Sequence, residues 1–177
     1  MGPEPIPGVY DPPGSHIWGW MLAPELEWLY AQARTMGSVV EVGSLHGRSA
    51  FALLKACRGP VYCIDPWDDE GRKCLPSFMG YCGGFPNLHA VQGLSPGVIE
   101  TYPLPDVDMT FIDGDHSWEG IEADVEAWLP KTRRLICGHD FNDAAEAGYP
   151  SVAGYVKQRF AGDYGVAPET SIWYVLL

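Results

Sequence analysis

The sequence has few basic residues, and it lacks both paired cysteine motifs and long apolar runs. Eleven lysines and arginines stand against 23 aspartates and glutamates, which gives a formal charge of -12. Such a charge would repel phosphate backbones and anionic lipid surfaces. No uninterrupted apolar run approaches the roughly 18 residues of a membrane span. We therefore expect neither nucleic acid nor a membrane as a partner, whereas a cationic ligand or a metal ion would be easier to hold.

The five cysteines form no Cys-x-x-Cys pair, and no secretory leader precedes them. These two absences favour a reduced, cytoplasmic protein without disulfides. Cys57, Cys63 and Cys137 fall in apolar runs, where a free cysteine behaves as a small hydrophobic side chain. Cys74 and Cys82 lie in a glycine-rich stretch and could bind a metal, but two ligands without a third are weak evidence for a site.

Nothing in the sequence divides the chain, because it contains no internal repeat and no low-complexity linker. With 46% hydrophobic residues, it can bury the core of one domain spanning residues 1–177. Residues 1–24 hold six of the 16 prolines together with Trp18 and Trp20, which predicts an ordered N-terminal arm rather than a helix. Residues 66–87 hold four glycines and three prolines without a clear period, which predicts a long loop and a candidate lid.

Apolar strands and amphipathic helices alternate along the rest of the chain. Strands are predicted at residues 38–42, 61–65, 87–93, 106–113, 133–140 and 171–177. Helices are predicted at residues 24–37, 51–57, 118–130 and 151–160. This alternation predicts an α/β fold with a parallel sheet and helices on both faces, and such a sheet binds ligands at the carboxyl ends of its strands.

The segment VVEVGSLHGRSAFALL places Gly43, Ser44 and Gly47 at a turn between a strand and a helix. Glycines at such a turn let a ligand approach the backbone and the helix N-terminus. A dinucleotide is one candidate, but Leu45 and Arg48 occupy the second and third glycine positions of G-x-G-x-x-G. Their side chains would block the approach of a pyrophosphate. A tight turn that binds nothing is a further alternative.

S-adenosylmethionine suits this turn better, since it has no pyrophosphate and carries a sulfonium and an ammonium that an acidic site attracts. Glu41 can face the ammonium, directly or through a water, and the turn glycines make room for the methionine portion. Asp65, at the end of the next strand, can bind the ribose diol. Trp67 is placed to flank the adenine, although packing within its loop is an equal alternative. The predicted cofactor-binding residues are Glu41, Gly43, Ser44, Gly47, Asp65, Trp67 and Asp113.

Four motifs occur in the order VEVGSLHGRSA, YCIDPW, FIDGDHSWEGIEADVEAWLP and ICGHDF. This order resembles the class I S-adenosylmethionine-dependent methyltransferases, most closely the small branch with D-G-D-H-S-[YW]-E-G and G-H-D-[YF]. The similarity runs from about Val39 to Phe160, and it leaves the N-terminal arm and the 66–87 segment without a counterpart. The resemblance implies a Rossmann-like, seven-stranded, mostly parallel sheet with helices on both faces and the last strand antiparallel.

Polar side chains follow two predicted strands, in FIDGDH and CGHDFND, that we expect to be neighbours. Four residues could gather at this edge: Asp113, Asp115, His139 and Asp140. Hard oxygen donors with one imidazole suit Mg²⁺ or Mn²⁺. The resemblance to metal-dependent O-methyltransferases implies ligands at Asp113 and at the adjacent pair His139 and Asp140. His139 stands where many of these relatives have a carboxylate.

The predicted reaction is methyl transfer from S-adenosylmethionine to a hydroxyl of a small molecule or a sugar. A divalent ion would lower the pKa of that hydroxyl and orient its oxygen. His116 and His139 are the candidate catalytic bases, because an imidazole titrates near neutrality. An equal alternative for His116 is to order the start of the following helix, which Ser117 is expected to cap. Hydrogen bonding within the turn is an equal alternative for Asp115.

Two functions of other classes stay open at this point. One is a nicotinamide-dependent oxidoreductase, and the other is a catalytically silent module that keeps the fold and the S-adenosylmethionine site. Trp18 and Trp20 could cover an acceptor pocket together with residues 66–87. They could equally pack into the core or form a subunit contact in a homo-oligomer, because aromatic residues are enriched at interfaces.

Overall fold

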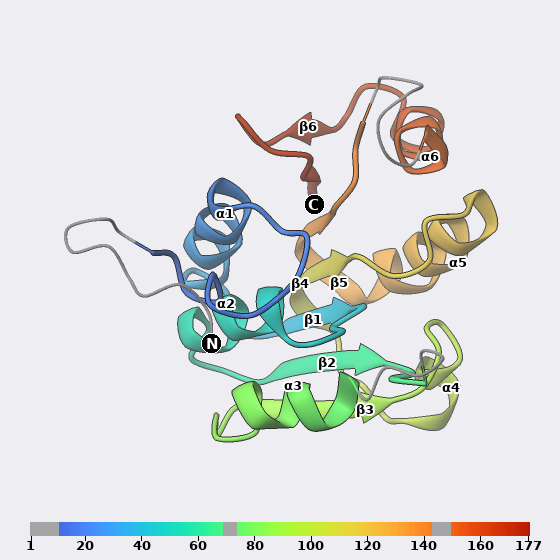
Figure 1. Cartoon of the computed structure of the whole chain (residues 1–177). Coiled ribbons are helices and arrows are strands. Elements are labelled where there is room, and N and C mark those ends of the chain that lie inside the picture. The colour runs from blue at the N-terminus through green and yellow to red at the C-terminus, as the bar shows by residue number, and fades with distance from the viewer. Residues whose placement is uncertain (1–10, 69–73, 143–149) are drawn as a thin grey trace.

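A computed structural model describes residues 11–68, 74–142 and 150–177 of the chain. In these residues the strands form one sheet in the order β3-β2-β1-β4-β5-β7-β6 (Figure 1). The strands are β1 (Val39–Val42), β2 (Val61–Asp65), β3 (Leu88–Gln92), β4 (Val107–Ile112), β5 (Thr132–Gly138), β6 (Gly165–Val166) and β7 (Trp173–Leu176). The first five strands run parallel, and β7 runs antiparallel to β5. The predicted fold class is therefore confirmed; the short strand β6 was not foreseen.

Helices cover both faces of this sheet (Figure 1). They are α1 (Ala23–Ala33), α2 (Arg48–Ala56), α3 (Cys74–Cys82), α4 (Val98–Thr101), α5 (Trp118–Trp128) and α6 (Pro150–Phe160), with a 3₁₀ turn at Leu129–Lys131. The inner strand β1 is buried throughout and packs Val39 against α1, α2 and α3. Val40 and Val42 point to the opposite face, where α4 and α5 lie. Alternate side chains of one apolar strand thus supply two cores.

The prediction of a long loop at residues 66–87 is wrong for Cys74–Cys82, where α3 lies. Cys74, Phe78 and Cys82 recur every fourth residue, and all three are buried in the core shared with α1 and α2. Pro76 fits because the first turn of a helix has N–H groups without intrahelical partners. The two cysteines of α3 are thus core side chains. Part of the proposed lid, residues 69–73, lies outside the described residues.

The described part of the N-terminal arm, residues 11–22, contains turns and no helix, as predicted. Ile17 and Met21 are buried, while Trp18 and Trp20 are 57% and 66% exposed. Arg48, the first residue of α2, donates hydrogen bonds to backbone carbonyls of the arm. Its Nε contacts the oxygen of Met21 at 2.8 Å, and its Nη1 contacts that of Ser15 at 2.7 Å and also that of Ile17. Arg48 therefore fixes the arm to the main domain.

All five cysteines are buried and free of disulfides, as their scattered spacing predicts. Among the described helices, none has the length and apolar character needed to cross a bilayer.

Replacing Arg48 by Lys should detach the arm, because a single ammonium cannot reproduce the fixed fork of guanidinium donors. We expect the free energy of unfolding to fall by about 1.5–3 kcal/mol, the range for a hydrogen bond to a charged group. Urea unfolding followed by tryptophan fluorescence measures this change. Arg58→Lys, at an exposed position after α2, is the matched control. Equal stability of the two variants would show that Arg48 does not hold the arm.

Candidate active site

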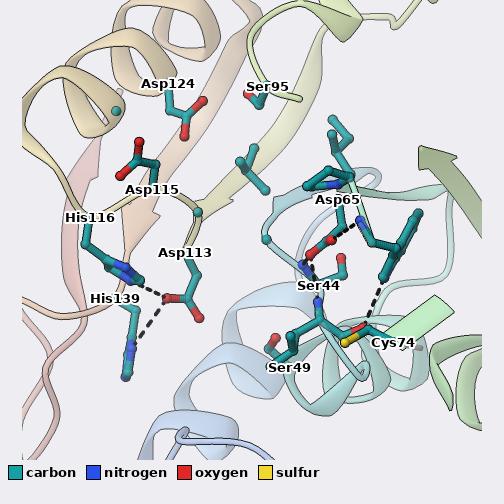
Figure 2. A pocket seen from close by; sticks show the side chains of 18 of the residues that line it. Ser44, Ser49, Asp65, Cys74, Ser95, Asp113, Asp115, His116, Asp124 and His139 are labelled. Atoms are coloured by element: carbon teal, nitrogen blue, oxygen red, sulfur yellow. Dashed lines mark hydrogen bonds and ion pairs between the residues drawn. The ribbon is translucent and has the colours of Figure 1, made fainter. Parts of the chain in front are cut away.

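The carboxyl ends of β1, β2, β4 and β5 border one cavity of about 1010 Å³. Its wall includes Gly43 after β1. It also includes Asp65 at the end of β2, Asp113 after β4 and His139 after β5 (Figure 2). The arm closes part of the rim through Trp18 and its neighbours. Ligand sites commonly measure roughly 300–1,000 Å³, so this cavity has room for two small molecules.

Gly43 and Gly47 both have positive φ angles, but they serve different purposes. A Cβ on Gly43 would lie 2.0 Å from the backbone oxygen of Asp113, so only glycine lets the tips of β1 and β4 meet. A Cβ on Gly47 would lie 2.7 Å from the Sγ of Cys82. Gly47 is not part of the described cavity wall. Gly47 thus lets α2 start close against α3, and its predicted contact with a ligand stays a prediction.

Asp65 holds the first turn in place through its carboxylate. Its Oδ2 accepts hydrogen bonds from the backbone N–H groups of Ser44 and Leu45, each at 2.9 Å. Its Oδ1 accepts one from the N–H of Trp67 at 2.7 Å. The carboxylate also borders the cavity. The same side chain therefore holds the turn and lies where a ribose is predicted to bind.

Trp67 contributes mainly to packing. Its indole N–H donates to the carbonyl of Leu45 at 3.0 Å, and its ring centroid lies 4.9 Å from that of Phe78. The residue borders the cavity but is only 6% exposed. Little of the ring is therefore free to flank an adenine, and the packing alternative accounts for most of its contacts.

Glu41 lies beneath the turn and not among the described cavity-lining residues. Its Oε2 accepts a hydrogen bond from the Oγ of Ser44 at 2.5 Å. Complete burial raises the pKa of Glu41 to about 7, although hydrogen bonding to Ser44 acts in the opposite direction. The predicted direct contact with an ammonium therefore has no support in the geometry, because Ser44 and not Glu41 reaches the cavity surface.

Four predicted residues do meet at the tips of β4 and β5: Asp113, His116, His139 and Asp140. Figure 2 labels the first three of them. The Nε2 of His116 lies 2.9 Å from the Oδ2 of Asp140 and 3.5 Å from the Oδ1 of Asp113. The Nδ1 of His139 lies 3.4 Å from the Oδ1 of Asp140 and 3.6 Å from the Oδ1 of Asp113. Ligand atoms of Asp113, His139 and Asp140 all lie within 4.8 Å of one another, a spacing that could hold a metal ion.

Glu25 on α1 completes this cluster, and nothing in the sequence pattern indicated it. Its Oε2 lies 3.0 Å from the Nε2 of His139 and accepts the N–H of Leu22 at 2.7 Å. Its Oε1 accepts hydrogen bonds from the N–H and the hydroxyl of Ser171, at 3.0 and 2.8 Å. Glu25 is 2% exposed. A buried carboxylate is stable only when it is hydrogen-bonded or paired, and these partners meet that need. Its role becomes visible only when the fold brings α1 to the end of β5.

Burial and carboxylate partners compete in setting the charge of the two histidines. Burial alone would lower the pKa of His139, but hydrogen bonds with Asp113, Asp140 and Glu25 outweigh it and raise this pKa to about 12. The same competition raises the pKa of His116 to about 9. Burial would raise the pKa of Glu25, yet the bond with His139 lowers it to about 2. Without a cation, the cluster is therefore an ionised network of carboxylates and imidazoliums.

Asp115 and Ser117 shape the loop between β4 and α5. The Oδ1 of Asp115 accepts the N–H of Ser117 at 2.9 Å, and the Oγ of Ser117 accepts the N–H of Gly120 at 3.0 Å. Ser117 is therefore the N-cap of α5, as predicted. Asp115 makes the local turn contact that was one of its two alternatives.

The parallel sheet, the glycine turn after β1 and the polar tips of β4 and β5 define a Rossmann-like class I methyltransferase. Residues 40–141, more than half of the chain, match the sequence model of a methyltransferase domain family. The chain therefore belongs to this methyltransferase family. The oxidoreductase alternative is set aside on this basis. No curated protein matches the chain at a significant level.

Solved structures share the fold over most of the chain. Cofactor-bound Rv0187 from MTB has a TM-score of 0.68 at 18% identity, covering 89% of this chain and 81% of that one. The O-methyltransferase TomG from Streptomyces achromogenes, in complex with SAM and involved in tomaymycin synthesis, has a TM-score of 0.65 at 18% identity, with the same coverage. An O-methyltransferase from Bacillus cereus in complex with SAH has a TM-score of 0.66 at 16% identity, covering 89% and 82%.

In metal-free protein, His116 should make stability depend on pH above neutrality. Its folded pKa of about 9 exceeds the ordinary value of 6.5, so its contribution is complete below pH 6.5 and disappears as the pH rises through 9. Thermal unfolding in chelator should therefore show a midpoint that falls from pH 6.5 to 9 more steeply in the wild type than in His116→Gln. His89→Gln, at an exposed position on β3, should keep the wild-type slope. Identical slopes in wild type and His116→Gln would contradict the assignment.

Proposed function

We propose that the protein transfers a methyl group from S-adenosylmethionine to a hydroxyl of a small molecule. The observation that carries this proposal is the single cavity that joins the Gly43 turn and Asp65 to the histidine–aspartate cluster. The class I fold and the S-adenosyl ligands named for two of the similar structures support the choice of cofactor. S-adenosylmethionine supplies a methyl group on a cationic sulfur, which the acidic surroundings favour.

The turn after β1 and Asp65 would hold the two ends of the ribosyl-methionine portion. Backbone groups of Gly43 and Ser44 border the cavity at one end. Asp65 borders the cavity at the end of β2, where a carboxylate can accept hydrogen bonds from the ribose hydroxyls. Its three bonds to backbone N–H groups already fix the orientation of this carboxylate. The reacting methyl group would then point toward Asp113.

The residues at the tips of β4 and β5 fit a divalent cation. Asp113 and Asp140 offer hard oxygen ligands, and His139 presents Nδ1 to the same position. Metal-bound histidines usually donate their other N–H to a carboxylate, and Glu25 occupies that place at Nε2. Mg²⁺ or Mn²⁺ bound there would supply Lewis-acid activation of the acceptor hydroxyl.

His116 is the better placed of the two candidate bases. Both histidines border the cavity, but the Nε2 of His139 is directed at Glu25 and its Nδ1 lies at the proposed metal position. The carboxylates of Asp113 and Asp140 keep His116 protonated, and neutralising their charge would lower its pKa toward neutrality. Its imidazole could then accept the hydroxyl proton as the oxygen attacks the methyl carbon.

The acceptor would enter beside the N-terminal arm. A second hollow of about 460 Å³ lies next to the cluster and is lined by Trp20, Leu22, Glu25, His139, Asp140, Asn142, Glu169, Thr170 and Ser171. The exposed ring of Trp20 lies edge-on to Trp18, with centroids 4.8 Å apart. An exposed aromatic pair at the rim offers an apolar surface for the ring of a phenol or a sugar. The arm held by Arg48 is thus the proposed acceptor-binding segment.

Methyl transfer should depend on a divalent cation, while cofactor binding should not. With methyl-labelled S-adenosylmethionine and a panel of phenolic and sugar acceptors, we expect chelator to abolish transfer and Mg²⁺ or Mn²⁺ to restore it. Asp113→Asn should reduce transfer at least 100-fold, because a ligand charge is lost. Calorimetry should show that S-adenosylhomocysteine still binds in chelator. Asp106→Asn, at an exposed position away from the cavity wall, is the charge-matched control.

Two results would count against this account in different ways. Full transfer in chelator would show that the reaction needs no metal ion, and His116 would then act as the base without one. Binding of NAD without any binding of S-adenosylhomocysteine would overturn the proposed cofactor.

A further inference from the structure

The peptide group between Met21 and Leu22, here the linking peptide, connects the N-terminal arm to the cluster at the tips of β4 and β5. Its carbonyl oxygen, which belongs to Met21, accepts a hydrogen bond from the Nε of Arg48 at 2.8 Å. Its N–H, which belongs to Leu22, donates to the Oε2 of Glu25 at 2.7 Å. One peptide plane therefore lies between a cation and a carboxylate. The proposed reaction uses neither this peptide nor Arg48, although Arg48 borders the cavity.

The same oxygen of Glu25 faces the cluster. Oε2 lies 3.0 Å from the Nε2 of His139, and the Nδ1 of this imidazole lies at the proposed metal position. The other carboxylate oxygen, Oε1, is held separately by the N–H and the hydroxyl of Ser171, at 3.0 and 2.8 Å. The contacts thus run without a break from Arg48 to the proposed metal position, and Oε2 is the carboxylate oxygen through which they pass.

The charges at the two ends of the linking peptide strengthen this connection. Hydrogen bonds in series polarise one another, so a cation at the carbonyl oxygen makes the N–H a better donor. Glu25 lies in the first turn of α1, where the helix dipole also favours a negative charge. Burial lowers the pKa of Arg48, and the charge of Glu25 acts in the opposite direction. The guanidinium and the carboxylate therefore stabilise each other across the peptide.

Two glycines let the arm lie directly on Arg48. A Cβ on Gly14, whose φ is +95°, would lie 2.1 Å from the backbone oxygen of Arg48. A Cβ on Gly19 would lie 2.9 Å from the Cδ of its side chain. The guanidinium also donates to two further carbonyl oxygens of the arm. The position of the linking peptide is thus set by a side chain that is itself fixed at several points.

We propose that Arg48 is a positioning residue of the active site, which acts through the linking peptide and Glu25 on the imidazole of His139. With the arm on Arg48, the linking peptide holds Oε2 of Glu25 against Nε2 of His139, and Nδ1 keeps its direction toward the metal position. This inference rests on the proposed function where it uses a metal ion. It adds a coupling between that ion and the arm, which is the proposed acceptor-binding segment. Such a coupling is reciprocal, so a bound ion would in turn stabilise the attached arm.

Mn²⁺ binding, followed by the electron paramagnetic resonance of free Mn²⁺, tests this coupling without turnover. Losing the carboxylate partner of a ligand histidine typically weakens metal binding about 10–100-fold. Arg48 acts one contact further away, so Arg48→Lys should weaken Mn²⁺ binding about fivefold or more. Gly19→Ala is a milder second variant, which displaces the Arg48 side chain but keeps its charge, and it should weaken binding in the same direction.

Arg134→Lys is the matched control. The Nη1 of Arg134 donates to the carbonyl oxygen of Thr35 at 2.7 Å, just after the other end of α1. This substitution changes the same chemistry away from the cluster, so it should leave Mn²⁺ binding at the wild-type value. Thermal unfolding should show that each variant is folded at the temperature of the titration.

A double-mutant cycle separates action through Glu25 from a general loss of packing. Glu25→Gln alone should weaken Mn²⁺ binding about tenfold or more. On this background, Arg48→Lys should add less than about a further twofold, because the two residues act in series. An equal effect of Arg48→Lys on both backgrounds would overturn the proposal. Unchanged Mn²⁺ binding in folded Arg48→Lys would also overturn it, and in both cases the proposed metal site would stand.

A measurement in chelator keeps this inference separate from the proposed metal ion. In protein labelled with ¹⁵N in its imidazoles, nuclear magnetic resonance reports the exchange of the His139 Nε2–H with water. This exchange should be about tenfold faster in Arg48→Lys than in wild type or Arg134→Lys, because the facing carboxylate is less firmly held. If wild type binds no Mn²⁺, the proposed metal role fails, and the exchange rate decides alone. Equal rates in wild type and Arg48→Lys would then overturn the positioning role.

Discussion

The buried pair formed by Glu25 and His139 links α1, the end of β5 and the segment before β7 in one place. Removing either partner would leave a buried charge without compensation, which is far more costly than losing an exposed ion pair. The pair also fixes the direction of the imidazole, so that Nδ1 faces Asp113 and Asp140. The chemistry at the tips of β4 and β5 thus depends on a helix that is remote in sequence.

Sequence order alone predicts the sheet and the meeting of Asp113 with Asp140, because both follow apolar strands of an alternating α/β pattern. It does not predict Glu25, since no local pattern distinguishes an acidic residue in the first turn of a helix from a solvent-exposed one. For Gly47 the sequence indicates only a turn, and the structure adds a packing reason for the glycine, its close approach to Cys82. The helix α3 was missed because Pro76 hides its period of four.

The cavity divides the proposed reaction between two groups of residues. Asp65 lies on the side where the nucleoside would bind, and its carboxylate is oriented by the turn after β1. His116 and the cluster of Asp113, His139 and Asp140 lie at β4 and β5, beside the arm that Arg48 attaches. Asp113 therefore lies between the proposed cofactor site and the proposed reacting residues, where the two halves of the sheet join. Gly43 makes this junction sterically possible.

A crystal structure with S-adenosylhomocysteine and Mn²⁺ tests the central claim most directly, since Mn²⁺ can be located by its anomalous scattering. The account predicts the ribose at Asp65, the homocysteine sulfur next to Asp113, and Mn²⁺ within about 2.0–2.6 Å of oxygens of Asp113 and Asp140. Nucleoside density outside this cavity, or Mn²⁺ bound away from these carboxylates while the nucleoside occupies it, would contradict the account.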